Sequence, residues 1–161
     1  MIADSRRLVA GVLDGDPRAI ARSISLVEAE GAAGADIIKG VFQQSGRATL
    51  LGVTGAPGVG KSSLVDRLVT TVRGDGRTIG VLAIDPTSPF SGGAVLGDRV
   101  RMQTHTGDVG VFVRSMATRG ELGGLARATS DAVVVLDAAG FDLIVIETVG
   151  VGQAEVEISR T

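Results

Sequence analysis

Residues 55–62 read GAPGVGKS, a full match to the pattern G-x-x-x-x-G-K-[ST]. An apolar run, residues 49–54, precedes this motif, and apolar residues at helical spacing follow it. Its glycines allow successive backbone N–H groups to point at a phosphate, and the following helix adds the positive end of its dipole. Because strand, loop and helix occur in the required order, the sequence predicts the phosphate-binding loop of a nucleoside triphosphatase. A glycine-rich turn that matches by chance is the alternative.

Two side chains of the motif are candidates for direct contact with a nucleotide. Lys61 is expected to reach the β- and γ-phosphates, and Ser62 is expected to bind magnesium. The chain has only one other lysine, Lys39, and arginine supplies the rest of its positive charge. A lone lysine inside this motif is therefore better explained by function than by a place on the solvated surface.

Composition limits the classes of protein to consider. With 161 residues, 44% of them hydrophobic, the chain can bury one ordinary core. A net charge of −2 gives no basic surface for nucleic acid or an anionic membrane. The absence of cysteine excludes disulfides and thiolate metal sites, and the single histidine leaves little for a zinc or nickel site. The apolar runs are too short to cross a bilayer and no apolar h-region follows Arg6 and Arg7, so we expect a cytoplasmic protein without a secretory signal.

The apolar pattern divides the chain into two segments. Residues 1–46 have helical spacing, and Asp16 followed by Pro17 predicts the N-cap and first turn of a second helix. We expect these helices to pack on the rest of the chain, with partner binding as the alternative. Residues 47–161 alternate strands and helices, which predicts an α/β, three-layer P-loop fold with a mostly parallel sheet. The expected strands are Leu50–Val53, Ile79–Ile84, Val109–Val113 and Leu143–Ile146, and the last two are separated by a helical pattern over Leu122–Leu136.

The carboxyl ends of parallel strands form the ligand-binding edge of such a sheet. Asp85 follows the second expected strand and opens a stretch rich in proline and glycine, residues 85–93, that suits a switch segment responding to a γ-phosphate. Asp98 lies further on, near the start of a helical stretch. It belongs either to that switch or to a helix N-terminus, where the dipole favours a carboxylate.

Glu147 ends the fourth expected strand and is followed by TVGVGQ. A carboxylate at a strand end that faces a phosphate loop can hold magnesium directly or through water. Gly150 is placed for its amide to meet the γ-phosphate. An ion pair between Glu147 and an arginine is the alternative. Gln153 is a candidate for positioning water, although its spacing from Gly150 is longer than in Ras-type GTPases.

Five further side chains receive plainer interpretations. His105 has no cysteine or histidine partner, so we expect a surface or hydrogen-bonded residue. Arg114 and Arg119 flank a loop expected after the third strand, where they either touch phosphate or are solvated or paired. Met102 and Met116 are expected to fill gaps in the core.

Four blocks of sequence together resemble one family. The blocks are GAPGVGKSSL, AIDPTSPFSGGAVLGDRVRM, FVRSMATRGELGGLA and DLIVIETVGVGQAEVEI. They are similar to the MeaB/ArgK/MMAA family of GTPases, of the SIMIBI class of P-loop proteins, over nearly the whole chain. Close relatives in that class have glutamate at the position of Glu147.

The resemblance implies a GTPase chaperone that binds GTP or GDP with Mg²⁺. Its partner would be adenosylcobalamin-dependent methylmalonyl-CoA mutase or a related mutase, whose cofactor loading and protection it couples to GTP hydrolysis. By motif match, Lys61, Asp98 and Glu147 would be the catalytic residues, and Ser62, Asp85 and Glu147 would order magnesium. Residues 147–153 would form the second switch. The residues that would hold the nucleotide are Gly55, Ala56, Pro57, Gly58, Val59, Gly60, Lys61, Ser62, Ser63 and Gly150.

The chain departs from the family in what it lacks. Family members continue for about as long again, with an N-K-x-D segment that reads guanine and a C-terminal arm that forms a homodimer. This chain contains no asparagine. We therefore expect it to be the N-terminal part of a longer protein, to discriminate bases weakly by itself, and to leave part of its sheet unpaired.

Three alternative functions stay open at the level of sequence. A metal-insertion GTPase of the nickel or cobalt type shares the loop and the glutamate, but it needs thiol or imidazole ligands. A non-catalytic docking module would contact a partner and hydrolyse nothing. An ATP-dependent kinase would differ in the base that it prefers.

Overall fold

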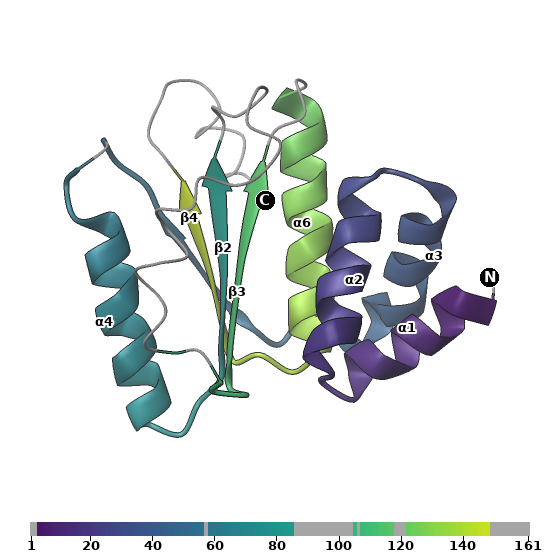
Figure 1. The fold of residues 1–161 in the computed structure, drawn as a ribbon, viewed down its shortest axis with the longest axis horizontal. Helices are drawn as coiled ribbons and strands as arrows, with labels where there is room; N and C mark the ends of the chain where they lie inside the picture. The colour runs from purple at the N-terminus through teal and green to yellow at the C-terminus, as the bar shows by residue number, and fades with distance from the viewer. Residues whose placement is uncertain (1–2, 57, 86–104, 106, 118–121, 149–161) are drawn as a thin grey trace.

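The computed structural model describes residues 3–56, 58–85, 105, 107–117 and 122–148. Three N-terminal helices come first in the chain, followed by strands and helices in alternation (Figure 1). The helices are α1 (Ala3–Leu13), α2 (Pro17–Glu28), α3 (Ala32–Val41), the short 3₁₀ helix η1 (Phe42–Gln44), α4 (Lys61–Gly74) and α6 (Leu122–Ala138). The strands are β1 (Thr49–Val53), β2 (Ile79–Asp85), β3 (Val111–Ala117) and β4 (Leu143–Thr148).

The four strands form one parallel sheet in the order β1-β4-β2-β3. The predicted α/β class with a parallel sheet is therefore confirmed. Strand β4 lies between β1 and β2, and its register pairs Glu147 with Val53 on one side and with Ala83 on the other. All four carboxyl ends consequently meet at one edge of the sheet, which is where the loop after β1 begins.

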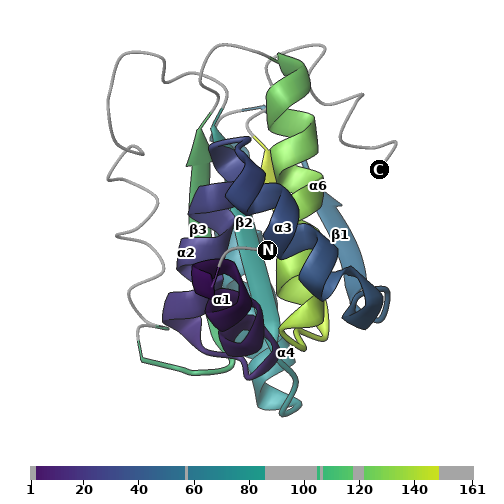
Figure 2. The same ribbon diagram turned by 90° about the vertical axis from the view of Figure 1, so that its right-hand side faces the viewer.

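Helices cover both faces of the sheet. Helix α4 lies on one face, and α6 lies on the other with α1–α3 packed outside it (Figure 1 and Figure 2). Successive strand residues point to opposite faces, so Val81 packs toward α4 and Leu82 toward α6. The core on the α4 face is formed by Val65, Val69, Val72, Ile79, Val81, Leu143 and Val145.

The N-terminal helices share a core with α6 and the sheet. Ile20, Ile24 and Ile37 are buried in the same cluster as Leu136 and Ile144. Helix α2 begins as predicted, because the Asp16 carboxylate accepts a hydrogen bond from the Arg18 N–H at 2.9 Å and Pro17 occupies the first turn. The boundary between residues 46 and 47 stays a prediction.

Glycine allows the close contact between α2 and α3. A Cβ on Gly34 would lie 2.6 Å from the Leu26 carbonyl oxygen, so a larger residue would push the two helices apart. Gly34 is buried. The α2–α3 contact therefore depends on the absence of a side chain at this position.

The third strand begins and ends later than the predicted Val109–Val113. The Val111 N–H donates to the Asp108 carbonyl at 3.0 Å, and the Gly110 N–H donates to the Asp108 carboxylate at 2.8 Å. This turn places Val109 outside the sheet, with 89% of its surface exposed. The strand then continues through Arg114, which the sequence pattern had placed at the start of a loop.

Candidate nucleotide-binding site

The loop between β1 and α4 depends on glycine for its backbone conformation. Gly55, Gly58 and Gly60 have φ angles of 145°, 80° and 97°, in the region that residues with a Cβ rarely adopt. Around Gly58 and Gly60 a Cβ would meet no atom within 4 Å, so backbone angle rather than space requires glycine there. Gly60 is also the N-cap of α4, in a left-handed conformation and without a side-chain cap. Pro57 lies outside the described residues.

The first turn of α4 opens at this loop. The first bond of the helix runs from the Leu64 N–H to the Gly60 carbonyl at 2.9 Å, so the preceding N–H groups have no partner within the helix. Together with the positive end of the helix dipole, these groups make a helix N-terminus suitable for a phosphate. Ser63 lies in this turn, and Val59 in the loop is 64% exposed.

Lys61 spans the loop. Its ammonium group donates to the carbonyl oxygens of Gly55 at 2.7 Å and Ala56 at 2.9 Å. The side chain is half-buried, so the charge is held at the mouth of the loop rather than free in solvent. An ammonium group in this position can bind an anion that enters the loop.

Ser62 and Glu147 lie in direct contact, although they are 85 residues apart in sequence. The Ser62 hydroxyl donates to Glu147 Oε1 at 2.7 Å. Ser62 comes from the first turn of α4, and Glu147 is the buried penultimate residue of β4, 8% exposed. Asp85 is the last residue of the neighbouring strand β2, whose Ala83 pairs with Glu147. Hydroxyl and carboxylate oxygens are ligands that Mg²⁺ prefers, so the Ser62 and Glu147 oxygens fit the ion.

A threonine pair that was not predicted from the sequence links the start of the loop to the end of β4. The Thr148 hydroxyl donates to the Thr54 hydroxyl at 2.9 Å. Thr54 precedes Gly55 and Thr148 follows Glu147, so the contact ties the start of the loop to the end of β4. Each threonine is adjacent in sequence to a predicted site residue, and parallel strands end at one edge. That combination was the signal that could have identified the pair.

Other candidates lie away from this cluster. Arg114 does not face the loop: it points to α2, where it donates to the Ala21 carbonyl at 3.0 Å and forms an ion pair with Glu28. Of the alternatives for Arg114, pairing is the one that the structure bears out, because β3 continues past it and its side chain meets α2. His105 contacts Asp66 at 3.2 Å, and Met116 is buried.

The remaining predicted residues lie outside the part of the chain that the structure describes. They are Met102, Asp98, Arg119, Gly150 and Gln153, and the side chain of Asp85 is likewise not described. Among the described residues, no group of three or more histidine, aspartate or glutamate side chains gathers as a ready-made metal site. No helix in this described part is long and apolar enough to span a membrane.

A parallel sheet whose first strand leads through a glycine loop into a helix defines the P-loop fold of nucleoside triphosphatases. The family described as "Methylmalonyl Co-A mutase-associated GTPase MeaB" matches residues 20–161. The chain belongs to this family.

Individual relatives agree with this assignment. A protein of Pyrococcus abyssi that is named as an inferred GTPase is 56% identical over 154 residues, covering 96% of this chain and 48% of the relative. A Caenorhabditis elegans protein named "Methylmalonic aciduria type A homolog, mitochondrial" is 37% identical over 169 residues, covering 96% and 42%. The crystal structure of an LAO/AO transport system kinase superposes with a TM-score of 0.75 at 27% identity, covering 99% of this chain and 48% of that one. The chain thus spans about half the length of these relatives.

Proposed function

We propose that the protein binds GTP with magnesium and hydrolyses it, as a chaperone for an adenosylcobalamin-dependent mutase. The observation that supports this most directly is the Ser62–Glu147 contact at 2.7 Å, made by the residue that follows Lys61 in the loop motif. It puts a hydroxyl, a carboxylate and a cation at the mouth of a loop that ends in a helix N-terminus. The identity of the nucleotide as GTP and of the partner as a mutase is inferred from the name of the family.

Each residue has a distinct role in this proposal. The N–H groups of the loop and the first turn of α4 would orient the phosphates, and Lys61 would exchange its two carbonyl contacts for phosphate oxygens. Ser62 and Glu147, with Asp85 from the adjacent strand, would hold Mg²⁺, which neutralises charge on the phosphates when bound. Asp98 and Gly150 are proposed to contact the γ-phosphate region. Catalysis would rest on positioning and charge, with no covalent step.

Replacing Lys61 tests the nucleotide chemistry. We predict that Lys61→Ala lowers the rate of Mg²⁺-dependent GTP hydrolysis by roughly a hundredfold or more. The substitution removes the positive charge that would contact the γ-phosphoryl group during its transfer. Phosphate release by the protein at its natural length, in single-turnover conditions, gives the rate. Lys39→Ala is the matched control, since Lys39 is the other lysine and lies exposed on α3. Unchanged turnover in Lys61→Ala would contradict the assignment, and background turnover in the unmodified protein would favour a docking module instead.

The mutase requires a separate experiment. The protein, loaded with a non-hydrolysable GTP analogue, is expected to retain a cobalamin-dependent mutase in a pull-down, and less of it when loaded with GDP. Competition between GTP and ATP for binding to the same protein tests which base the site prefers. Recovery of no such enzyme would remove the chaperone role and leave the nucleotide chemistry in place.

A further inference from the structure

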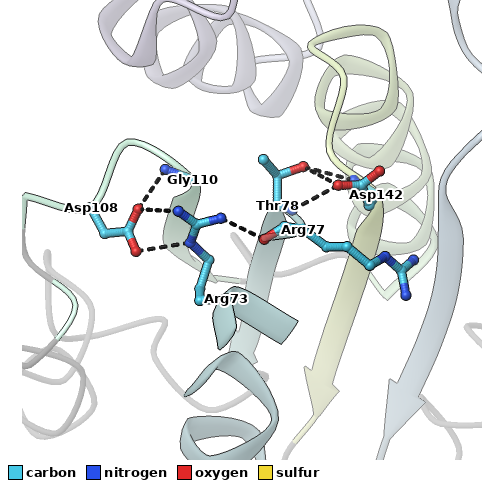
Figure 3. Close-up of polar contacts among 6 residues, drawn as sticks. All are labelled: Arg73, Arg77, Thr78, Asp108, Gly110 and Asp142. Atoms are coloured by element: carbon cyan, nitrogen blue, oxygen red, sulfur yellow. Dashed lines mark hydrogen bonds and ion pairs between the residues drawn. The ribbon is translucent and has the colours of Figure 1, made fainter. Parts of the chain in front are cut away.

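The far end of α4 is held by a network of charged and polar contacts (Figure 3). The Arg73 guanidinium makes two parallel bonds to the Asp108 carboxylate, Nε to Oδ2 at 2.8 Å and Nη2 to Oδ1 at 2.9 Å. Its Nη1 donates to the Arg77 carbonyl at 2.6 Å. The pKa of Asp108 is lowered by its bonds from Arg73 and from the Gly110 N–H. The guanidinium is therefore fixed by three directed bonds, and the carboxylate by the two that it accepts from Arg73 and the one from Gly110.

A second contact joins the same two segments closer to the loop. His105 Nε2 lies 3.2 Å from Asp66 Oδ1. Asp66 and Arg73 are seven positions apart, which places them on one face of α4 about 10 Å apart along its axis. His105 and Asp108 are three positions apart and belong to one turn, in which the Asp108 N–H donates to the His105 carbonyl at 3.2 Å. This turn precedes β3 and is attached to α4 at two points.

The apolar attachment of α4 is narrow by comparison. Val65, Val69 and Val72 form its buried stripe, while Leu64 is 61% exposed. Leu68 adds a partly buried side chain to this stripe, and apolar burial of this kind is not directional. Directed contacts at two heights on the helix oppose a shift along its axis.

We propose that the Arg73–Asp108 ion pair, with the His105–Asp66 contact, positions α4 along its axis so that Lys61 and Ser62 meet the nucleotide and Glu147. Arg73 is twelve residues beyond Lys61, about 18 Å along the helix, so it cannot touch the nucleotide and acts through α4. This role rests on the proposed nucleotide binding. Arg73 and Asp108 are positioning residues, not catalytic ones.

Gly110 offers a way to disturb the pair without removing either charge. A Cβ at this position would lie 2.3 Å from Arg73 Cζ and 2.5 Å from Nη1. Gly110 is not among the glycines with positive φ, so alanine fits the backbone. The Gly110→Ala substitution therefore displaces the guanidinium from Asp108 and leaves the net charge unchanged.

The test measures nucleotide affinity in a double-mutant cycle. Arg73→Gln, Asp108→Asn, the double variant and Gly110→Ala are compared with the unmodified protein at its natural length, using a fluorescent GDP analogue with Mg²⁺. Each single variant is expected to raise Kd roughly two- to fivefold, with the double variant no worse than either single one, as for one shared, partly exposed ion pair. The difference in Kd between each variant and the unmodified protein should shrink at high salt, because salt screens such a pair. Arg67→Gln, an exposed charge on α4 without an ion pair among the described residues, is the control.

Hydrogen exchange separates this proposal from the proposed function. The amides of Leu64 and Val65 close the first turn of α4 and are expected to exchange faster in Gly110→Ala than in the unmodified protein. Variants that melt at a lower temperature but keep both the Kd and this exchange rate would overturn the positioning role. If the unmodified protein binds no nucleotide, the proposed function fails, while the exchange rates still decide whether Arg73 acts on the first turn of α4.

Discussion

Asp137 at the end of α6 fixes the segment that leads into β1. Its carboxylate accepts hydrogen bonds from three consecutive backbone N–H groups, those of Gly46, Arg47 (3.1 Å) and Ala48 (3.0 Å). The side chain is 9% exposed. This carboxylate therefore holds the residues that enter β1, the strand that continues into the phosphate-binding loop.

The Asp137→Ala substitution should destabilise the protein by about 2 kcal/mol, because it leaves several N–H groups without their charged acceptor. The Asp137→Asn substitution should destabilise the protein less, since its amide oxygen can still accept a hydrogen bond from these N–H groups. Chemical denaturation monitored by circular dichroism gives the free energy of unfolding. Asp14→Ala, an exposed carboxylate in the turn after α1, is the control and should change it by less than about 0.5 kcal/mol. Equal effects of both alanine variants would contradict the role of Asp137.

At the residue scale, the sequence indicated candidate members of the site but not their contacts. Lys61, Ser62 and Glu147 could be named because glycine spacing and strand ends limit where a phosphate can bind. The partner of each could not be named. Ser62 meets Glu147 only because β4 lies next to β1, and strand order depends on packing between distant segments.

Among the elements, the amino ends of β2 and β4 are joined by a polar contact. The Thr78 N–H and hydroxyl both donate to Asp142 Oδ2, at 2.7 and 2.8 Å, and the Asp142 N–H donates back to the hydroxyl at 3.0 Å (Figure 3). Bonds from the Thr78 backbone and then its side chain lower the pKa of Asp142 below its ordinary value of 3.8. The pKa of Asp108 is lowered in the same direction by Arg73.

These two carboxylates should make the stability depend on pH in acid. A group whose pKa is lower in the folded state stabilises the fold above its unfolded pKa, and this contribution is lost as pH falls toward the folded pKa. The Asp108→Asn/Asp142→Asn double variant should therefore melt at a lower temperature than the unmodified protein at pH 7, and the difference should narrow at pH 3, below the ordinary value of 3.8. Thermal melts at the two pH values measure it. An equal difference in melting temperature at pH 7 and pH 3 would show that the charges of these two carboxylates contribute nothing to stability.

Helices and strands could be predicted from the sequence where the apolar residues followed a single period, helical or extended. Val133–Leu136 resembled a strand in isolation but lies in α6, because helical spacing extends on both sides of it. The third strand was misplaced because its pattern is interrupted: Asp108 forms a turn that removes Val109, and Arg114 is a charged residue inside a strand. Arg114 is tolerated in the strand because it pairs with Glu28 of α2. This partner lies 86 positions away, so no local pattern reveals it.

At the scale of the whole molecule, β1 is far more exposed than β4, the strand with which it pairs. Four of its five residues are exposed, whereas five of the six residues of β4 are buried. Leu50 and Leu51 are 49% and 39% exposed. Beside the strand lies an apolar groove of about 640 Å³, whose lining includes Leu50, Val53, Val133, Val134 and Ile146. Within the described residues, only β4 pairs with β1.

We predict that this side of β1 is covered in a protein as long as the relatives, which are about twice the length of this chain. The Thr49 N–H donates toward β4, to the Asp142 carbonyl at 3.0 Å, and N–H directions alternate along a strand, so those of Leu50 and Gly52 face the open edge. These two amides should exchange rapidly in the 161-residue chain and slowly in the longer protein. The amide of Leu51, which points to β4, should be protected in both and serves as the internal control. Rapid exchange of Leu50 and Gly52 in the longer protein would mean that the edge stays open there, and that the relatives place their remaining residues elsewhere.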